Sequence, residues 1–468
     1  MNTPHIRDFQ SQAIHMIGIG GSSMSGLAQM LLEKGYRITG SDNLETYATK
    51  KLRQELGIPV VIGHRAENVR GAALVIYTAA ILPDNPERVE AARLGIPTLE
   101  RGVLLGQLME GYPVAIGVCG AHGKTTTTAM LSQVLMVCGA DPTIHIGGTL
   151  DFIGGSTRIG HGDTFLAEAC EFNRSFLHLR PTLAVVLNID ADHLDCYGDI
   201  EHIQEAFGQF LGLLPEDGCA LGNGDDFRVR ELLQALSCEK RTFGLGEGCD
   251  YQPGGLSFDE LGRGSFTLLY HGEKLGQVKL TVPGEFQVMN ALAALSAAHV
   301  RGLDMADACA ALGDFKGAHR RFELTSVIQG VKLYHDYGHN PTEMRNCLSV
   351  AAKQPHNRLW AVMQPHTFSR VKALFPDYLT CTQAADITLV TDIYAAREKD
   401  PGDIRSEMLV SGMREQGINA IHTPSFDDTE RYLREHWQPG DLVLTMGCGN
   451  INQLNDQIFQ HEEQNSHD

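Results

Sequence analysis

The chain has 468 residues, of which 43% are hydrophobic and 20% charged, a composition typical of a globular protein with about three domains. Its formal net charge of −19 argues against binding to nucleic acid or to anionic membranes, because the long-range field repels polyanions. The sequence shows no signal-peptide pattern and no apolar run of the roughly 20 residues that a membrane helix needs, so we expect a cytoplasmic protein without membrane insertion. The 11 cysteines include no CxxC pair, and we expect buried thiols.

Residues 1–110 alternate short apolar runs with helical patterns. The run AIHMIGIG at 13–20 leads into a helical pattern that ends near Lys34 and Gly35, and the alternation continues to IPTLER at 96–101. Such alternation is typical of a parallel, doubly wound sheet. We therefore expect a Rossmann-like domain in this part of the chain.

A second series of strand patterns occupies residues 111–318, including PVAIGVCG (113–120) and DTFLAEAC (163–170). Residues 240–285 are richer in glycine and alternate in polarity, which predicts antiparallel hairpins at the edge of a mainly parallel sheet. A third alternating series occupies residues 319–468. The sequence thus predicts an α/β protein of three domains, in which two Rossmann-like domains flank a central domain of the P-loop ATPase type.

The first of two glycine-bearing turns contains Gly18, Gly20 and Gly21, between a predicted strand and a predicted helix. In this setting, glycine lets a pyrophosphate approach the backbone at a helix N-terminus. The spacing departs from GxGxxG because Ser23 stands at the third glycine position. The turn is compatible with a dinucleotide, with a UDP-sugar and with a purely steric strand-to-helix turn.

The second turn is more specific for phosphate. Its sequence from 117 to 126 is GVCGAHGKTT, in which Val118 stands where the GxxxxGK[ST] pattern has its first glycine. Free amides near Gly120 and Gly123 can still cradle phosphate oxygens, while Lys124 supplies a cation and the Thr125 hydroxyl can reach Mg²⁺. We expect this loop to bind ATP.

Six motifs together resemble those of the Mur ligase family of peptidoglycan synthesis, in order and over essentially the whole chain. They are GAHGKTTTT (120–128), AEACE (167–171), LNIDADHLD (187–195), HRRFE (319–323), DYGHNPTE (336–343) and QPHTFSR (364–370). The resemblance is greatest to members that join L-alanine to UDP-N-acetylmuramate at the expense of ATP. It implies that the first domain holds the UDP-sugar, the second holds ATP, and the third closes over both. The sequence does not decide between a monomer and a homodimer.

The resemblance also assigns roles to individual residues. ATP is assigned to Gly120, Ala121, His122, Gly123, Lys124, Thr125, Thr126, Asn290 and Asp336. Mg²⁺ is assigned to Thr125, Glu168 and His193. Because histidine is an unusual ligand for Mg²⁺, we expect Mn²⁺ to substitute for it. Catalysis is assigned to Lys124, His193, Arg320, Arg321 and His339. UDP-sugar contacts are expected from Gly20, Ser22, Asp42 and Arg101, whereas His366 and Arg370 are expected to face the amino acid or the sugar nucleotide.

The chain departs from the family pattern at two places. PGxHNxxN is here PGEFQVMN, with Phe286 and Gln287 in place of His-Asn, and DDYGHHPTE is here HDYGHNPTE, with His335 and Asn340 substituted. At these positions the contacts with adenine and with the substrate that the family pattern implies do not carry over directly to this chain.

Four other functions compete with this interpretation. A ligase that recycles a whole tripeptide typically has an EPRS-type sequence where QPHTFSR stands here, and a folate polyglutamate ligase leaves the first domain unexplained. A nicotinamide dehydrogenase would use the first glycine turn and Asp42, but it leaves Lys124 and Thr125 without a role. A nucleotide-binding regulator without catalysis also remains open. The sequence does not decide between L-alanine, glycine and L-serine.

Overall fold

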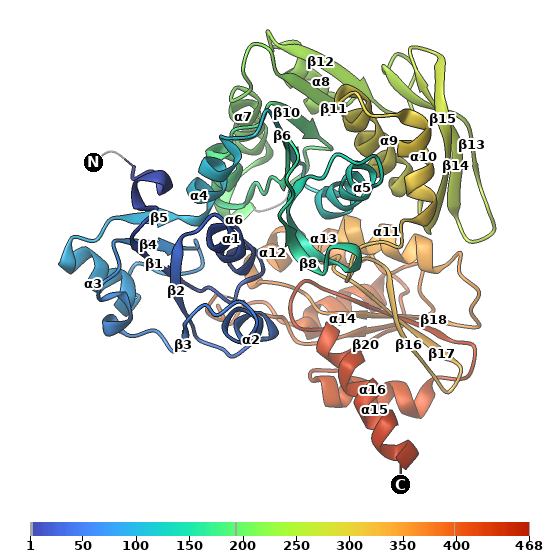
Figure 1. The fold of residues 1–468 in the computed structure, drawn as a ribbon. Helices are drawn as coiled ribbons and strands as arrows, with labels where there is room; N and C mark the ends of the chain where they lie inside the picture. Colours follow the sequence, from blue (N-terminus) through green and yellow to red (C-terminus); the bar gives the residue numbers. More distant parts are fainter. Residues whose placement is uncertain (1–2, 192–193, 397, 468) are drawn as a thin grey trace.

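The computed structural model describes residues 3–191, 194–396 and 398–467. It has three α/β parts, each built around its own sheet: the N-terminal part at the left of Figure 1, the central part above, and the C-terminal part below. The predicted fold class is confirmed. In the described part of the chain, no helix is long and apolar enough to cross a membrane.

The first sheet has the strand order β3-β2-β1-β4-β5, with every pair parallel. Its strands are β1 (Ala13–Ile17), β2 (Arg37–Asp42), β3 (Val60–Ile62), β4 (Leu74–Tyr77) and β5 (Thr98–Glu100). Its helices are η1 (Ile6–Phe9), α1 (Ser22–Glu33), α2 (Tyr47–Gln54), η2 (Ala66–Val69), α3 (Pro86–Leu94) and α4 (Arg101–Met109). The glycine turn joins β1 to α1, so it lies at the carboxyl edge of this sheet.

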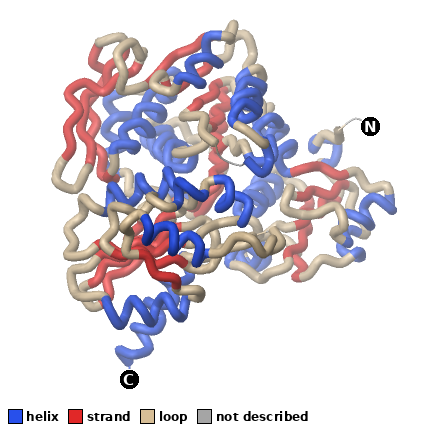
Figure 2. The backbone as a smooth tube through the Cα atoms, turned by 180° about the vertical axis from the view of Figure 1, so that it is seen from behind, coloured by secondary structure: helices blue, strands red, loops and turns tan. Residues whose placement is uncertain are grey.

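The central sheet has the order β15-β14-β13-β12-β11-β10-β6-β9-β7-β8. Its strands are β6 (Val114–Cys119), β7 (Thr143–Leu150), β8 (Gly155–Arg158), β9 (Thr164–Glu168), β10 (Leu183–Val186), β11 (Cys219–Asn223), β12 (Glu239–Phe243), β13 (Tyr251–Phe258), β14 (Arg263–Tyr270) and β15 (Glu273–Pro283). The predicted hairpins are confirmed, since β13, β14 and β15 pair antiparallel at the outer edge visible in Figures 1 and 2.

Helices cover both faces of the central sheet. They are α5 (Lys124–Val137), η3 (Asp151–Ile153), η4 (Phe172–His178), α6 (Leu194–Tyr197), α7 (Ile200–Leu211), α8 (Phe227–Gln234), α9 (Glu285–Val300), α10 (Met305–Ala311) and η5 (Leu312–Asp314). Side chains of α5, α9 and α10 share one hydrophobic core, whereas those of α7 and α8 belong to another.

The third sheet has the order β16-β17-β21-β18-β19-β20, in which only the edge strand β16 is antiparallel to its neighbour. Its strands are β16 (Glu323–Ile328), β17 (Val331–Asp336), β18 (Leu359–Met363), β19 (Ile387–Val390), β20 (Ala420–His422) and β21 (Leu442–Met446). Its helices are α11 (Pro341–Ala351), α12 (Phe368–Ala373), α13 (Phe375–Tyr378), α14 (Ser406–Glu415), α15 (Phe426–His436) and α16 (Asn452–His467).

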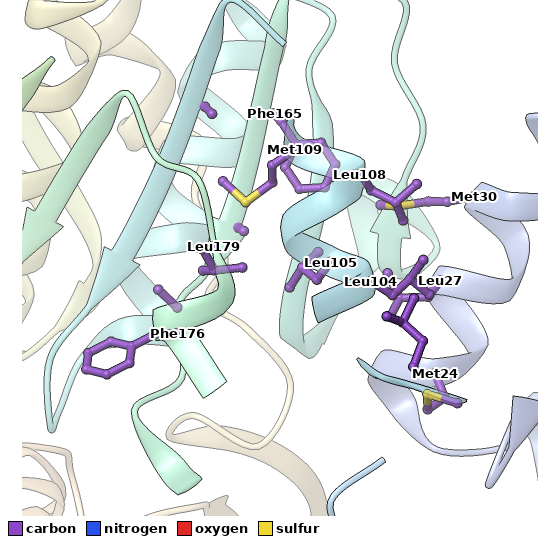
Figure 3. Close-up of a cluster of buried hydrophobic side chains, with 14 of the residues drawn as sticks. Met24, Leu27, Met30, Leu104, Leu105, Leu108, Met109, Phe165, Phe176 and Leu179 are labelled. Atoms are coloured by element: carbon purple, nitrogen blue, oxygen red, sulfur yellow. The ribbon is translucent and has the colours of Figure 1, made fainter. Parts of the chain in front are cut away.

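One hydrophobic core joins the first part of the chain to the central part. Figure 3 shows Leu27 of α1 beside Leu104 of α4, whereas Leu105 lies on the other side of α4, toward Leu179 of the central part. All of these side chains are at most 2% exposed. Burial of each such side chain contributes about 1.5 to 3 kcal/mol. The packing therefore fixes where α1 and α4 stand relative to the central sheet.

A buried carboxylate organises the end of β2, directly beside the first glycine turn. The Glu87 side chain of α3 is 0% exposed and accepts hydrogen bonds from Ser41 Oγ at 2.6 Å and Asn68 Nδ2 at 2.5 Å. His15 Nε2 lies 3.4 Å away. Burial opposes ionisation of Glu87, but its hydrogen bonds with His15, Ser41 and Asn68 hold the pKa down to about 2.

Replacing Glu87 by Ala should lower the free energy of unfolding by about 3 kcal/mol, because buried donors lose their charged acceptor. The folded pKa lies below the ordinary value of 4.5, so this contribution is complete above pH 4.5 and is lost as the pH falls toward about 2. Urea unfolding followed by circular dichroism at several pH values measures both effects. Glu90→Ala on the same helix is the control, since Glu90 pairs with the exposed Arg93. Equal losses in the two variants would contradict the network's role.

Candidate active site

The second glycine turn forms a closed loop between β6 and α5. Gly120 and Gly123 have φ values of +150° and +83°, which favour glycine. Asn188, which follows β10, accepts a hydrogen bond from the His122 amide at 2.8 Å and donates one to the His122 carbonyl at 3.0 Å. Since α5 begins at Lys124, its first amides have no acceptor within the helix and can bind an anion.

Lys124 is folded back onto its own loop. Its Nζ donates to the carbonyls of Gly120 at 2.6 Å and Ala121 at 3.0 Å, and to Glu171 Oε1 at 2.9 Å. Burial alone would lower the pKa of Lys124, but the charge of Glu171 raises it above its ordinary value. The ammonium is therefore charged and close to the amides at which a phosphate would bind.

Glu168 joins this loop to the neighbouring strand β7. Its Oε1 accepts a hydrogen bond from Thr125 Oγ1 at 3.0 Å, and its Oε2 accepts one from the Gly147 amide at 2.8 Å. A hydroxyl and a carboxylate side by side are the oxygen donors that Mg²⁺ prefers. His193, the third predicted metal residue, lies outside the described residues. Within residues 3–191, 194–396 and 398–467, no three His, Cys, Asp or Glu side chains form a metal-binding group.

Arg321 brings the segment before the third sheet to the loop. Its Nη2 donates to Thr125 Oγ1 at 3.4 Å. Arg320 and Phe322 on either side have φ values of +63° and +47°, a conformation that costs non-glycine residues about 1 to 3 kcal/mol each. Burial opposes the charge of Arg321, but Asp336 and Glu343 help to raise its pKa. The strained backbone thus aims a charged guanidinium at the candidate phosphate site.

Arg320 is held by neutral acceptors. Its Nε donates to His335 Nε2 at 3.0 Å, and its Nη2 donates to the carbonyls of Gly447 and Gly449 at 3.3 and 3.2 Å. The guanidinium also stacks over Tyr337 at 4.8 Å from the ring centroid. Burial and the charge of Arg320 lower the pKa of His335 to about 3, so the substituted histidine acts as a neutral acceptor.

The other predicted residues of the third part gather at the carboxyl edge of its sheet. Asp336 is buried and accepts a hydrogen bond from the Phe322 amide at 2.8 Å, so it anchors the segment that carries Arg321. The His339 and His366 rings lie 5.8 Å apart, and Arg370 Nη1 lies 3.1 Å from His366 Nδ1.

Asn290 of α9 lies against the glycine turn at the opposite side. Its Oδ1 accepts a hydrogen bond from Thr127 Oγ1 at 3.2 Å, and its Nδ2 donates to Gln287 Oε1 at 3.1 Å. A Cβ placed on Gly123 would lie only 2.6 Å from Asn290 Oδ1, which explains the glycine there. Gln287, which departs from the family pattern, therefore orients Asn290.

The first glycine turn forms a second charged site. The Gly20 amide donates to Asp42 Oδ2 at 2.9 Å, and α1 begins at Ser22. Arg101, the first residue of α4, donates from Nη1 to Ser23 Oγ at 3.2 Å. The structure thus brings together all four residues that were predicted to contact a UDP-sugar.

Comparison with known proteins identifies the family. Three family models match: "Mur ligase family, catalytic domain" at 13–113, "Mur ligase middle domain" at 118–298, and "Mur ligase, glutamate ligase domain" at 320–449. The chain belongs to the Mur ligase family. The UDP-N-acetylmuramate--L-alanine ligases of Acetivibrio thermocellus and Caldanaerobacter subterraneus subsp. tengcongensis are each 44% identical to it, over 96% of this chain and 96% and 98% of their own lengths.

Solved structures of Mur ligases share the fold. UDP-N-acetylmuramate-alanine ligase from Thermotoga maritima has a TM-score of 0.82 and 27% identity, covering 97% of this chain and 100% of that one. A murein peptide ligase from Psychrobacter arcticus has a TM-score of 0.73 and 23% identity, covering 97% and 99%, and shows likeness of fold alone.

The structure gives a role to three residues of the Mur ligase motifs for which the sequence predicted none. Glu171 pairs with Lys124, Asn188 holds the loop, and Glu343 lies 3.1 Å from His122 Nδ1. All three stand inside the quoted motifs, so the motifs were the available signal. Their partners depend on tertiary contacts that spacing along the chain does not reveal.

His122 links the loop to the third part of this Mur ligase. Its Nε2 lies 2.9 Å from Asp190 Oδ2, opposite the contact with Glu343. Burial lowers the pKa of His122, but the hydrogen bonds to Asp190 and Glu343 raise it to about 10. The imidazole is therefore a cation at neutral pH, held between two carboxylates.

Replacing Glu343 by Gln should lower the pKa of His122, since the imidazolium loses one of its two charged partners. NMR titration of ¹⁵N-labelled histidine measures this directly, and the wild-type ring should stay protonated at pH 8. Glu415→Gln, on the exposed surface of α14, is the matched control. A wild-type ring that is neutral at pH 8 would contradict the bridged arrangement.

Proposed function

We propose that this chain is an ATP-dependent ligase that joins L-alanine to the lactyl carboxylate of UDP-N-acetylmuramate, a step in the synthesis of peptidoglycan precursors. The observation that carries the proposal is the pair of glycine turns at two different sheets, one with the half-buried Lys124 and the other with Arg101. Relatives that are 44% identical over 96% of this chain have the same activity in their names. ATP and a sugar nucleotide as substrates place the reaction in the cytoplasm.

We propose a division of labour between three domains. Residues 1–110 bind the UDP-sugar, residues 111–318 bind ATP, and residues 319–468 close over both and receive the amino acid. The buried core that joins α1 and α4 to the central sheet supports a fixed placement of the first two sites. The contacts of Arg321 and His122 support closure by the third domain.

The reaction needs no covalent bond to the protein. An oxygen of the lactyl carboxylate attacks the γ-phosphorus of ATP, the bond to the β-phosphate oxygen breaks, and ADP and an acyl phosphate form. The L-alanine amine then attacks the acyl carbon, and inorganic phosphate leaves from the tetrahedral intermediate as the amine loses a proton. Positioning and charge stabilisation are what the protein contributes.

Residues of this chain supply those contributions. Lys124 exchanges its carbonyl partners for the β- and γ-phosphate oxygens, and Arg321 balances the charge that develops on the transferred phosphoryl group. Arg320, whose side chain donates to neutral acceptors, adds a second guanidinium to the same region. Asn290 and Asp336 border the nucleotide, whereas His339, His366 and Arg370 border the amino acid.

The oxygen donors of Thr125 and Glu168 fit Mg²⁺, and we propose that they hold it together with His193. The metal, when bound, neutralises phosphate charge and orients the γ-phosphoryl group. Mn²⁺ should replace it, because a histidine ligand suits Mn²⁺ better than Mg²⁺.

The test is a coupled assay of ADP release with UDP-N-acetylmuramate and each candidate amino acid. ADP should form only when both UDP-N-acetylmuramate and L-alanine are present, with mass spectrometry detecting the amide product. Turnover with an L-alanyl-γ-D-glutamyl-diaminopimelate tripeptide instead of L-alanine would identify a recycling ligase. Reduction of a nicotinamide without ATP would contradict the ligase proposal altogether.

Lys124→Ala should reduce kcat/KM by more than about 100-fold, because a positioned cation in a dry site contributes about 3 kcal/mol to the transition state. Calorimetry should show nearly unchanged affinity for UDP-N-acetylmuramate, since the two ligands occupy different domains. Lys274→Ala, in an exposed hairpin strand, is the control. Loss of UDP-sugar binding in the Lys124 variant would mean that both ligands share one site.

A further inference from the structure

A buried histidine of the central part reaches the first glycine turn. His145, on β7, is 3% exposed, and its Nε2 lies 2.8 Å from Ser23 Oγ. The same hydroxyl accepts the hydrogen bond from Arg101. The other ring nitrogen of His145 lies 3.3 Å from Thr157 Oγ1 on β8. Arg101, Ser23, His145 and Thr157 therefore form one continuous series of polar contacts, from helices of the first part to two strands of the central sheet.

The chemistry of these groups fixes the direction of the hydrogen bonds. A guanidinium only donates, so Ser23 Oγ accepts from Arg101 and keeps its own proton to give. Burial and the charge of Arg101 lower the pKa of His145 to about 3, so its ring is neutral, with one donor and one acceptor nitrogen. Nδ1–H donating to Thr157 leaves Nε2 to accept the proton of Ser23, so both ring nitrogens of His145 and the hydroxyl of Ser23 have partners.

Close packing of α1 and α4 against the central part leaves these polar side chains little room to move. A Cβ on Gly26 of α1 would lie 1.9 Å from Thr157 Oγ1, and one on Gly106 of α4 would lie 1.9 Å from the His178 carbonyl. Helices α1 and α4 thus approach the central part as closely as glycine allows. Figure 3 shows the apolar contacts that hold these two helices together. The hydroxyl of Ser23 is consequently placed by both parts of the chain.

Arg101 is the cation nearest to the first glycine turn that the structure shows in contact with it. Among the residues that the structure describes, no ion pair includes Arg101, and the acceptor that its side chain contacts is an uncharged hydroxyl. Arg101 is the first residue of α4, and its guanidinium contacts Ser23 in the first turn of α1, where the helix leaves its first amides without an acceptor. A diphosphate is the ligand chemistry that suits such a combination of cation and free amides.

We propose that His145 is a positioning residue for the sugar-nucleotide site: it fixes Ser23, and through Ser23 it holds the Arg101 guanidinium where the ligand's diphosphate binds. The site of the first domain is thus completed by a strand of the ATP-binding domain. This inference depends on the proposed function in one respect, that the ligand of the first turn is a UDP-sugar.

The experiment compares His145→Ala, His145→Gln and Arg101→Ala by calorimetry with UDP-N-acetylmuramate and by steady-state kinetics. His145→Ala should raise Kd and KM for the sugar nucleotide about tenfold, with kcat and KM for ATP within about twofold, since one positioned hydrogen bond is lost. His145→Gln, which keeps an acceptor, should recover most of the affinity. Exposed His161→Ala is the control.

A double-mutant cycle separates positioning from a general effect on structure. In the Arg101→Ala background, His145→Ala should cost little more, because its effect passes through Arg101. Additive losses, or an unchanged Kd in His145→Ala, would overturn the inference. If His145→Ala does not fold, Ser23→Ala replaces it in the same cycle. A wild-type protein that does not bind UDP-N-acetylmuramate would instead contradict the proposed function.

Discussion

The ammonium of Lys124 is enclosed by the loop that carries it, and Glu171 supplies the negative charge that its burial requires. An unpaired buried ion costs several kcal/mol, so this ion pair sets how the segment after β9 packs against the loop. Glu168 stands three residues before Glu171, and the same segment therefore brings Glu168 to Thr125. The positions of the candidate metal-binding and phosphate-binding residues therefore depend on the ion pair between Lys124 and Glu171.

Each of the other parts reaches the site through single polar side chains. Strand β7 is the clearest case: His145 contacts the first glycine turn, and Gly147, two residues further, donates its amide to Glu168. From the third part, Arg321 reaches Thr125 and Glu343 reaches His122. At each glycine turn, side chains that would contact a ligand are therefore held in place by a residue from another part of the chain. This dependence gives a physical basis for a reaction that needs both nucleotides bound at the same time.

The sequence predicted the fold because its periodic signals are local: alternating strands and helices, glycine turns, and polarity alternation in the edge hairpins. It also predicted which motifs meet, since the carboxyl ends of parallel strands share an edge. Partners in space were not predictable. In the sequence, His145 is only one residue of a buried strand pattern. Its contact with Ser23 joins residues that are 122 positions apart, which no local pattern predicts. Likewise, the role of His335, which departs from the family pattern, is visible only in the structure, where its Nε2 accepts a hydrogen bond from Arg320.

The central claim is that two glycine turns hold two different ligands and that one transfer site forms between them. A crystal structure of this protein with UDP-N-acetylmuramate and a non-hydrolysable ATP analogue tests it most directly. We expect the terminal phosphates of the analogue at Lys124 and Thr125, and the diphosphate of the sugar nucleotide at Gly20, Ser22 and Arg101. A sugar-nucleotide diphosphate bound at Lys124, or both nucleotides at the edge of one sheet, would contradict it.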